Sequence, residues 1–202
     1  MNNNFVSMIK NLQLPEKLHD RERENVVDFF STPFMETMEK FKIKDDYQYT
    51  GNYVVITLPL IQSLYNLFND KKVVEVMSGT GLLAYHLRNY GLNDLIATDN
   101  NSWGLLGEKP PITPIIQMDA VEAVKTNKDA DIILMCWPPF DNNIAEQVLD
   151  AMATGQTLIC CGERYGCTGT TKFWNKFNSE VMDLPYEPLF TLKDKFYIGI
   201  KE

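Results

Sequence analysis

Histidine is scarce in this sequence, and its placement argues against a metal site. The only two histidines, His19 and His86, lie far apart, and neither has a second ligand at a spacing typical of zinc. The four cysteines all fall in the last third of the chain, three of them in or beside apolar segments. We therefore expect reduced, buried thiols and no bound metal.

Long hydrophobic runs are also missing. The most apolar window, 53–68, is interrupted by Pro59, Gln62 and Asn66, and the first residues show no signal-peptide pattern. These features predict a soluble, cytoplasmic protein that does not associate with membranes.

Basic residues are fewer than acidic ones. The chain has 19 Lys and Arg against 27 Asp and Glu, a formal net charge of −8. Such a surface repels a phosphate backbone, so nucleic acid is disfavoured as a ligand. The basic residues near the C-terminus are scattered, which is typical of a solvated face.

What the sequence does contain is enough apolar surface for one domain. Of 202 residues, 45% are hydrophobic and 11% aromatic. In residues 1–48 apolar positions are spread among charges, which predicts a helical extension that packs on the domain or covers its ligand. We place the domain itself at 49–202.

From residue 53 short apolar runs alternate with amphipathic stretches, the pattern of an α/β fold with a parallel sheet and helices on both faces. Strands are predicted at 72–77, 94–98, 113–117, 131–136, 156–161, 188–193 and 195–200. Helices are predicted at 58–69, 81–90, 120–127, 142–153 and 170–178. In the last two strands the apolar runs Leu189–Leu192 and Phe196–Ile200 are separated only by Lys193, Asp194 and Lys195, so they are expected to form an antiparallel hairpin.

A small-residue turn follows the first predicted strand. The strand runs into Ser78, Gly79, Thr80 and Gly81 just before a helix, where backbone N–H groups can approach a ligand closely. Asp99 follows the second strand, twenty residues after Gly79, where a carboxylate can accept hydrogen bonds from both hydroxyls of a ribose. The alternative for Asp99 is a cap or turn residue before Asn100.

Asp119 and Ala120 close the third predicted strand in the same way. An acceptor at Asp119 can take the amino group of an adenine. It can equally cap the helix that begins at Val121, and the two roles are compatible.

Residues 75–81 resemble the first motif of class I S-adenosylmethionine-dependent methyltransferases, an acidic residue followed by alternating glycines, with Met77 in place of the first glycine. The resemblance covers about residues 49–202. It implies a Rossmann-like, mostly parallel sheet that ends in an antiparallel hairpin, and S-adenosylmethionine as cofactor. The cofactor-binding residues it implies are Glu75, Met77, Ser78, Gly79, Thr80, Gly81, Asp99, Asn100, Asp119, Ala120 and Cys136.

The segment after the fourth predicted strand reads Trp137, Pro138, Pro139, Phe140. Two prolines fix the backbone and give a stiff loop at the carboxyl edge of the sheet. The loop resembles the proline-proline-aromatic loop of methyltransferases that modify amino nitrogens, in which Asp or Asn precedes the prolines and accepts hydrogen bonds from the amine. Trp137 is donor-only at that position. These four residues are expected to wall the acceptor pocket, or else to form a rigid strand-to-helix connection.

A little-characterised methyltransferase-like family has a similar Cys-Trp-Pro-Pro-aromatic loop, followed by Gly-Glu and Gly-Cys-Thr segments; here these are 136–140, 162–163 and 166–168. Glu163 ends the fifth predicted strand on the edge that carries the turn and the loop. It is a candidate general base or substrate anchor. The alternative is an ion pair with Arg164.

Three functions remain in view. The first is an S-adenosylmethionine-dependent methyltransferase of unknown acceptor, for which a small molecule or protein is favoured over nucleic acid. The second is a catalytically silent protein that binds S-adenosylmethionine or serves as a scaffold. The third, NAD-linked oxidoreduction, fits the turn and Asp99 but neither the terminal hairpin nor the loop at 136–140.

Overall fold

The computed structural model describes residues 44–45, 48, 52–104, 111–189 and 191–202. The predicted helical extension, 1–48, falls almost wholly outside these residues, so it stays a prediction. Within the described part no helix is long and apolar enough to cross a membrane.

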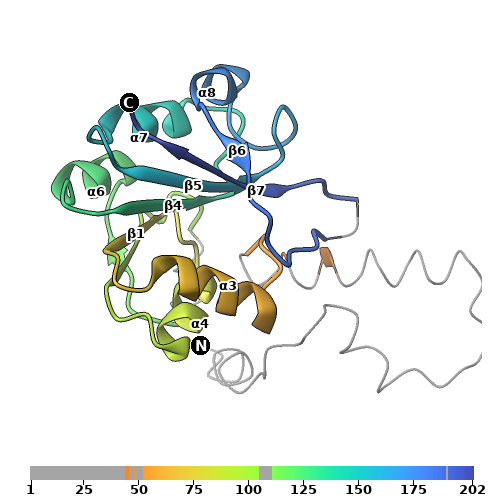
Figure 1. The fold of residues 1–202 in the computed structure, drawn as a ribbon. Helices are drawn as coiled ribbons and strands as arrows, with labels where there is room; N and C mark the ends of the chain where they lie inside the picture. Colours follow the sequence, from red (N-terminus) through yellow and green to blue (C-terminus); the bar gives the residue numbers. More distant parts are fainter. Residues whose placement is uncertain (1–43, 46–47, 49–51, 105–110, 190) are drawn as a thin grey trace, which may run out of the picture.

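The described helices and strands alternate along the chain, as the apolar pattern predicts (Figure 1). In chain order they are α3 (Leu58–Phe68), β1 (Val73–Val76), α4 (Leu82–Tyr90), β2 (Leu95–Asp99), β3 (Ile116–Gln117), α6 (Ala120–Thr126), β4 (Ile132–Cys136), α7 (Ile144–Ala151), β5 (Thr157–Gly162), α8 (Thr171–Lys176), β6 (Glu180–Val181) and β7 (Lys195–Ile200).

The strands form one seven-stranded sheet in the order β3-β2-β1-β4-β5-β7-β6. Pairs from β3 to β5 are parallel, and β7 runs antiparallel to both β5 and β6. A Rossmann-like sheet that is mostly parallel and ends antiparallel is therefore confirmed.

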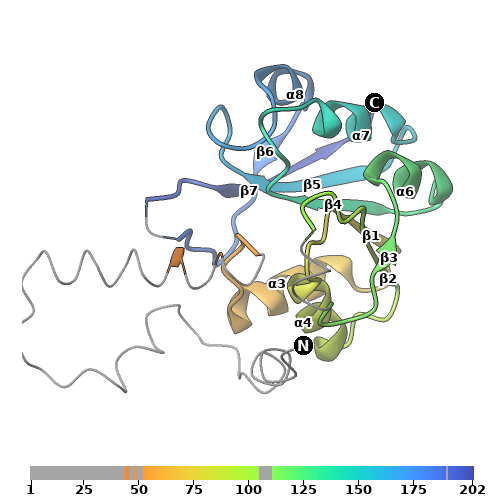
Figure 2. The same ribbon diagram turned by 180° about the vertical axis from the view of Figure 1, so that it is seen from behind.

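Helices cover both faces of the sheet, which is also confirmed (Figure 2). Helices α3 and α4 pack on one face, where their apolar side chains meet those of Val73, Leu134 and Ile159. Helices α6, α7 and α8 pack on the other face against Val74 and Ile133. Successive strand residues point to opposite faces, so buried strands of this kind are apolar at nearly every position.

The final hairpin is where the predicted strands were wrong. The described residues of 188–193 contain no strand, and β7 pairs instead with β6, through Glu180↔Ile198 and Val181↔Tyr197. Pro185 and Pro188 supply no backbone N–H, which disfavours a strand around them. The described residues between Met182 and Asp194 therefore form a connection without strands, and Asp194 lies directly before β7.

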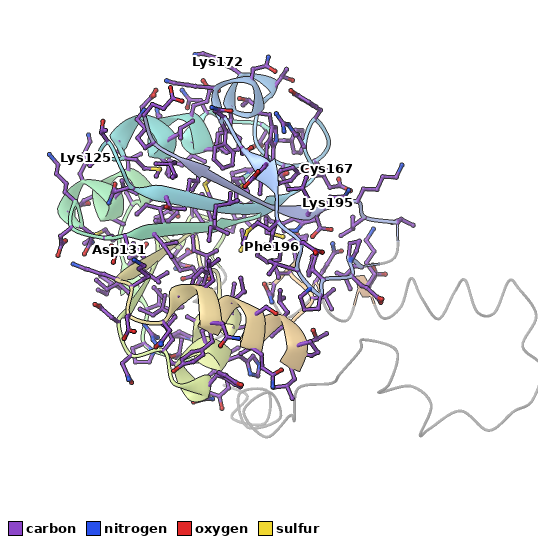
Figure 3. All side chains as sticks on the ribbon, viewed as in Figure 1. Lys125, Asp131, Cys167, Lys172, Lys195 and Phe196 are labelled. Carbon is purple, nitrogen blue, oxygen red and sulfur yellow. The ribbon has the colours of Figure 1, made fainter. Side chains whose placement is uncertain are left out.

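The carboxyl ends of the parallel strands lie on the side of the molecule where Figure 3 labels Cys167 and Lys195, opposite the side that carries Lys125 and Asp131. Gly162, at the end of β5, pairs with Lys195 there. Ligands of open α/β sheets bind at this edge.

Candidate active site

A cavity of about 400 Å³ opens at the carboxyl ends of β1, β2 and β4. Its volume suits a small ligand. Nineteen of the described residues line it: Asn52, Tyr53, Val54, Glu75, Met77, Ser78, Gly79, Asp99, Asn100, Ser102, Trp103, Ala120, Cys136, Trp137, Pro139, Asn142, Asn143, Ile144 and Gln147. Most residues predicted to bind the cofactor are among them.

The turn after β1 has a left-handed backbone at every second residue. The φ angles of Met77, Gly79 and Gly81 are 56°, 56° and 78°. Glycine adopts this conformation at little cost, whereas a methionine is strained in it. The backbone therefore explains why glycines alternate in the motif that this turn resembles, and shows that Met77 keeps the same path without being glycine.

Only the first half of the turn reaches the cavity. Met77, Ser78 and Gly79 line it, whereas Thr80 and Gly81 do not. A Cβ on Gly81 would come within 2.9 Å of side-chain atoms of both Ile115 and Thr113, so this glycine allows a close approach between segments. Thr80 is buried. Thr80 and Gly81 therefore contribute to the packing of the turn and not to the wall of the cavity.

Asp99 joins the ends of β1 and β2. Its Oδ2 accepts a hydrogen bond from the Gly79 backbone N–H at 2.9 Å, and its Oδ1 accepts one from the Asn101 N–H at 2.7 Å. The turn role is therefore confirmed for Asp99. Because the side chain also lines the cavity, the same bonds fix the carboxylate at the cavity wall.

The next two predicted residues differ from each other. Asp119 is exposed and caps α6, where its Oδ1 accepts hydrogen bonds from the N–H groups of Val121 at 2.8 Å and Glu122 at 3.3 Å. Its capping role is confirmed, and a contact with adenine stays a prediction. Ala120 lines the cavity.

Glu75 is the most unusual charged group of the site. It is 3% exposed, lines the cavity, and its Oε2 has no hydrogen-bond partner among the described residues. Burial raises the pKa of this carboxyl to about 8; Arg88 opposes the rise and Asp99 adds to it. A buried oxygen without a partner is costly, and a cationic ligand group would relieve that cost.

The proline loop contributes two of its four residues to the cavity. Trp137 and Pro139 line it, Pro138 is buried behind it, and Phe140 is 61% exposed. Trp137 has a φ of 53°, a left-handed conformation directly before a proline. The ring of Tyr53 stacks on the indole at 4.9 Å between centroids, with 26° between the ring planes.

The segment at 162–169, at and after the end of β5, contacts the proline loop and supports it. Thr168 forms an isolated antiparallel bridge with Pro139, and the Gly169 N–H donates to the Pro138 carbonyl at 2.9 Å. Gly162 leaves room for Thr168, because a Cβ there would lie 2.4 Å from the Thr168 Oγ1. The Gly-Glu and Gly-Cys-Thr segments thus have a common structural role.

Glu163 belongs to this support and does not line the cavity. Its Oε1 accepts from the Lys193 N–H at 2.7 Å and its Oε2 accepts from the Cys167 N–H at 3.3 Å. The described part of the chain contains no ion pair between Glu163 and Arg164, whose guanidinium instead lies near the rings of Trp174 and Tyr197. A catalytic role for Glu163 stays a prediction that this geometry does not favour.

Several residues of the site were not predicted from the sequence. Asn142 and Asn143 directly follow the proline loop, so their place next to it was a usable signal. Tyr53 and Asp194 gave none, since Tyr53 lies in the segment before α3 and Asp194 follows the connection after β6. The Trp137 Nε1 donates to Asp194 Oδ2 at 3.2 Å.

No family model and no curated protein matches the sequence. Solved structures similar to this chain include PigF with SAH, at 14% identity, 72% of this chain, 62% of that chain and a TM-score of 0.45. A putative RNA methyltransferase from Pyrococcus horikoshii matches at 19% identity, 70% of this chain, 79% of that chain and a TM-score of 0.43. Precorrin-6y C5,15-methyltransferase from Geobacter metallireducens GS-15 matches at 11% identity, 72% of this chain, 87% of that chain and a TM-score of 0.46. The match thus spans less than two thirds of the PigF chain.

Proposed function

We propose that the chain is an S-adenosylmethionine-dependent methyltransferase whose cofactor lies on the turn at 77–79, with its ribose hydroxyls on Asp99. The observation that carries the proposal is the hydrogen bond from the Gly79 N–H to Asp99 Oδ2, which brings turn and carboxylate together at the cavity wall. Ala120 and the end of β3 are the proposed adenine side of the site.

The charges of the cavity fit this cofactor. Glu75 and Asp99 are the acidic side chains among the described residues that line it, and no lysine or arginine is among these residues. S-adenosylmethionine carries a positive sulfonium, a positive amino group and one carboxylate, and is therefore cationic overall. The unpartnered Oε2 of Glu75 is suited to one of its two positive groups. A phosphate group has no cationic partner among these lining residues.

The cofactor, when bound, supplies a methyl group attached to a positively charged sulfur. As the methyl passes to the acceptor, the sulfur keeps the electron pair of the broken carbon–sulfur bond. The protein holds the acceptor in line with that methyl, and orientation of this kind supplies a large part of the rate. The proposed acceptor wall consists of Tyr53, Trp137 and Pro139. Glu163 lies outside the cavity, so the proposal assigns no general base.

A small molecule or protein is the proposed acceptor, in preference to nucleic acid. The net charge of −8 and the acidic cavity support this preference. The indole N–H of Trp137 is already bound to Asp194, so the residue before the prolines does not orient an amine here. The side-chain oxygen of Asn143, which makes no cap hydrogen bond on α7, is better placed for that role.

Met77 is the observation that favours the second candidate, a silent protein that binds S-adenosylmethionine without turnover. Its side chain lines the cavity at the position where the resembled motif has a glycine. A methionine there narrows the space for the cofactor.

Calorimetric titration with S-adenosylmethionine, S-adenosylhomocysteine and NAD tests the cofactor. We expect binding of the first two and none of NAD; binding of NAD alone would overturn the proposal. Incubation with methyl-labelled S-adenosylmethionine and a cell extract then separates the candidates, because a silent binder transfers no label. The variant Asp99→Ala is the matched negative control for both measurements.

A further inference from the structure

A buried carboxylate outside the cavity is tied to the cavity wall. Asp194 is 1% exposed and lies just before β7. Three donors converge on its Oδ2: the Trp137 Nε1 at 3.2 Å, the Tyr186 hydroxyl, and the Cys161 Sγ at 3.6 Å. Its Oδ1 has no partner among the described residues. Burying such a group costs several kcal/mol by itself, so its contacts have to compensate.

Only one of the three donors lines the cavity. Trp137 does, whereas Tyr186 and Cys161 pack within the core on the α3 and α4 face of the sheet. The carboxylate thus reaches the candidate acceptor side through one side chain, the indole.

The conformation of Trp137 has to be stabilised by its surroundings. Its left-handed φ of 53° is strained for a bulky side chain such as tryptophan. The backbone is fixed by the Trp137 N–H, which donates to the Cys161 carbonyl at 2.8 Å. The ring is fixed separately, with Tyr53 on its face and Asp194 at its edge. Strain that persists next to a cavity points to a function for the held side chain.

A purely structural role for Asp194 predicts a different outcome. In that case the carboxylate serves to fasten residues 182–194 through Tyr186, and the bond to the indole is incidental. The two roles differ in what the indole does once the carboxylate is removed.

We propose that Asp194 is a positioning residue that fixes the ring of Trp137 as the acceptor wall of the cavity. The proposal rests on the proposed function in one respect, that Trp137 meets the acceptor. Tyr186 donates to the same oxygen and keeps the carboxylate turned toward the indole.

The test uses the full chain labelled with 5-fluorotryptophan. The three tryptophans, Trp103, Trp137 and Trp174, give three fluorine resonances, and Trp137→Phe assigns one of them. Asp194→Ala removes the acceptor, and Asp194→Leu removes it while filling the volume, which protects against loss of folding. Asp194→Asn keeps a side-chain oxygen in the same place.

We expect the Trp137 resonance to shift or broaden in the Ala and Leu variants and to stay at the wild-type position in the Asn variant. The Trp174 resonance serves as the internal reference, since its Nε1 donates elsewhere, to the Thr168 carbonyl at 2.7 Å. Glu146→Gln is the matched control: Glu146 is also a buried carboxylate with side-chain partners, but these are Thr170 and Lys172 and not Trp137. It is expected to leave the Trp137 resonance unchanged.

An unchanged Trp137 resonance in folded Asp194→Leu would overturn the proposal, as would an Asn variant that behaves like the Leu variant. The proposed function fails separately, if wild-type protein binds neither S-adenosylmethionine nor S-adenosylhomocysteine. We expect the Leu variant to keep its affinity for S-adenosylhomocysteine within a few-fold, because Asp194 acts on the acceptor wall; loss of that affinity alongside wild-type Trp137 resonance would also overturn the proposal.

Discussion

The Asp99 carboxylate accepts a hydrogen bond from the Gly79 backbone N–H at 2.9 Å, although twenty residues separate them in the chain. Parallel pairing of β1 with β2 places the two strand ends side by side, and the turn then points its N–H at the carboxylate. A ligand that meets one of these groups therefore meets the other.

Asp99→Ala is expected to weaken binding of S-adenosylhomocysteine by about 1.5–3 kcal/mol, the range for losing hydrogen bonds to a charged group. Calorimetry measures the change. The control is Asp131→Asn at the opposite sheet edge, where Asp131 accepts from the Lys72 N–H at 2.8 Å. Equal affinity in the Asp99 variant and the wild type would remove this carboxylate from the site.

The raised pKa of Glu75 predicts that affinity for S-adenosylmethionine depends on pH. Near neutral pH the carboxyl is mostly protonated because its pKa is about 8, and a cationic ligand favours the ionised form. Affinity should therefore rise between pH 6 and pH 8 as less work is needed to remove the proton. Glu75→Gln should bind more weakly and lose this dependence; a wild type with flat affinity over the range contradicts the prediction.

The same group predicts a pH dependence of stability without ligand. Below pH 4.5 the carboxyl is protonated in both states, and between 4.5 and about 8 it ionises in the unfolded state only. The free energy of unfolding should therefore fall as pH rises through this window. Glu75→Gln should be more stable than the wild type at pH 8, and denaturant unfolding at pH 5 and pH 8 compares the two.

Two variants of Met77 test the backbone conformation at this position. At most positions alanine is more stable than glycine, but at a φ of 56° the order should reverse, because the Cβ costs roughly 1–2 kcal/mol in the left-handed region. We expect Met77→Gly to be more stable than Met77→Ala in denaturant unfolding. Both variants remove the long side chain from the cavity, so a higher affinity for S-adenosylhomocysteine in both than in the wild type would show that the methionine side chain narrows the site.

Much of the site could be predicted because it follows from strand ends. Apolar runs identify the parallel strands, and every parallel strand delivers the residues that follow it to one edge. Glu75, Met77, Gly79 and Asp99 line the cavity for this reason. The same logic placed Glu163 at the edge but could not show that its two oxygens accept from backbone N–H groups of neighbouring loops.

The remainder depends on contacts that no local pattern encodes. Strand β6, which pairs with β7 on the side away from β5, has only two residues, Glu180 and Val181. Both are exposed, so β6 lacks the apolar run by which the other strands were found. Placing the strand later, at 188–193, also hid Asp194, which was expected in a hairpin turn and is instead buried against Trp137. Tyr53, which lies far from Trp137 in the sequence, stacks on the same indole.

Gly162 carries the last prediction, which concerns the support beneath the proline loop. A Cβ at this position would lie 2.4 Å from the Oγ1 of Thr168, a buried residue that donates to the Glu163 carbonyl at 3.1 Å and bridges to Pro139. Gly162→Ala should therefore displace Thr168 and lower the free energy of unfolding by about 1–3 kcal/mol, the usual cost of overpacking.

A double-mutant cycle separates crowding from any other effect of the methyl group. Thr168→Ala removes the atom in closest approach, so the double variant should lose less stability than the sum of the two single variants. Denaturant unfolding of all four proteins gives the coupling. Additive losses would mean that the methyl group acts elsewhere, whereas a coupling together with a shifted Trp137 resonance in Gly162→Ala would show that β5 supports the acceptor wall through Thr168 and Pro139.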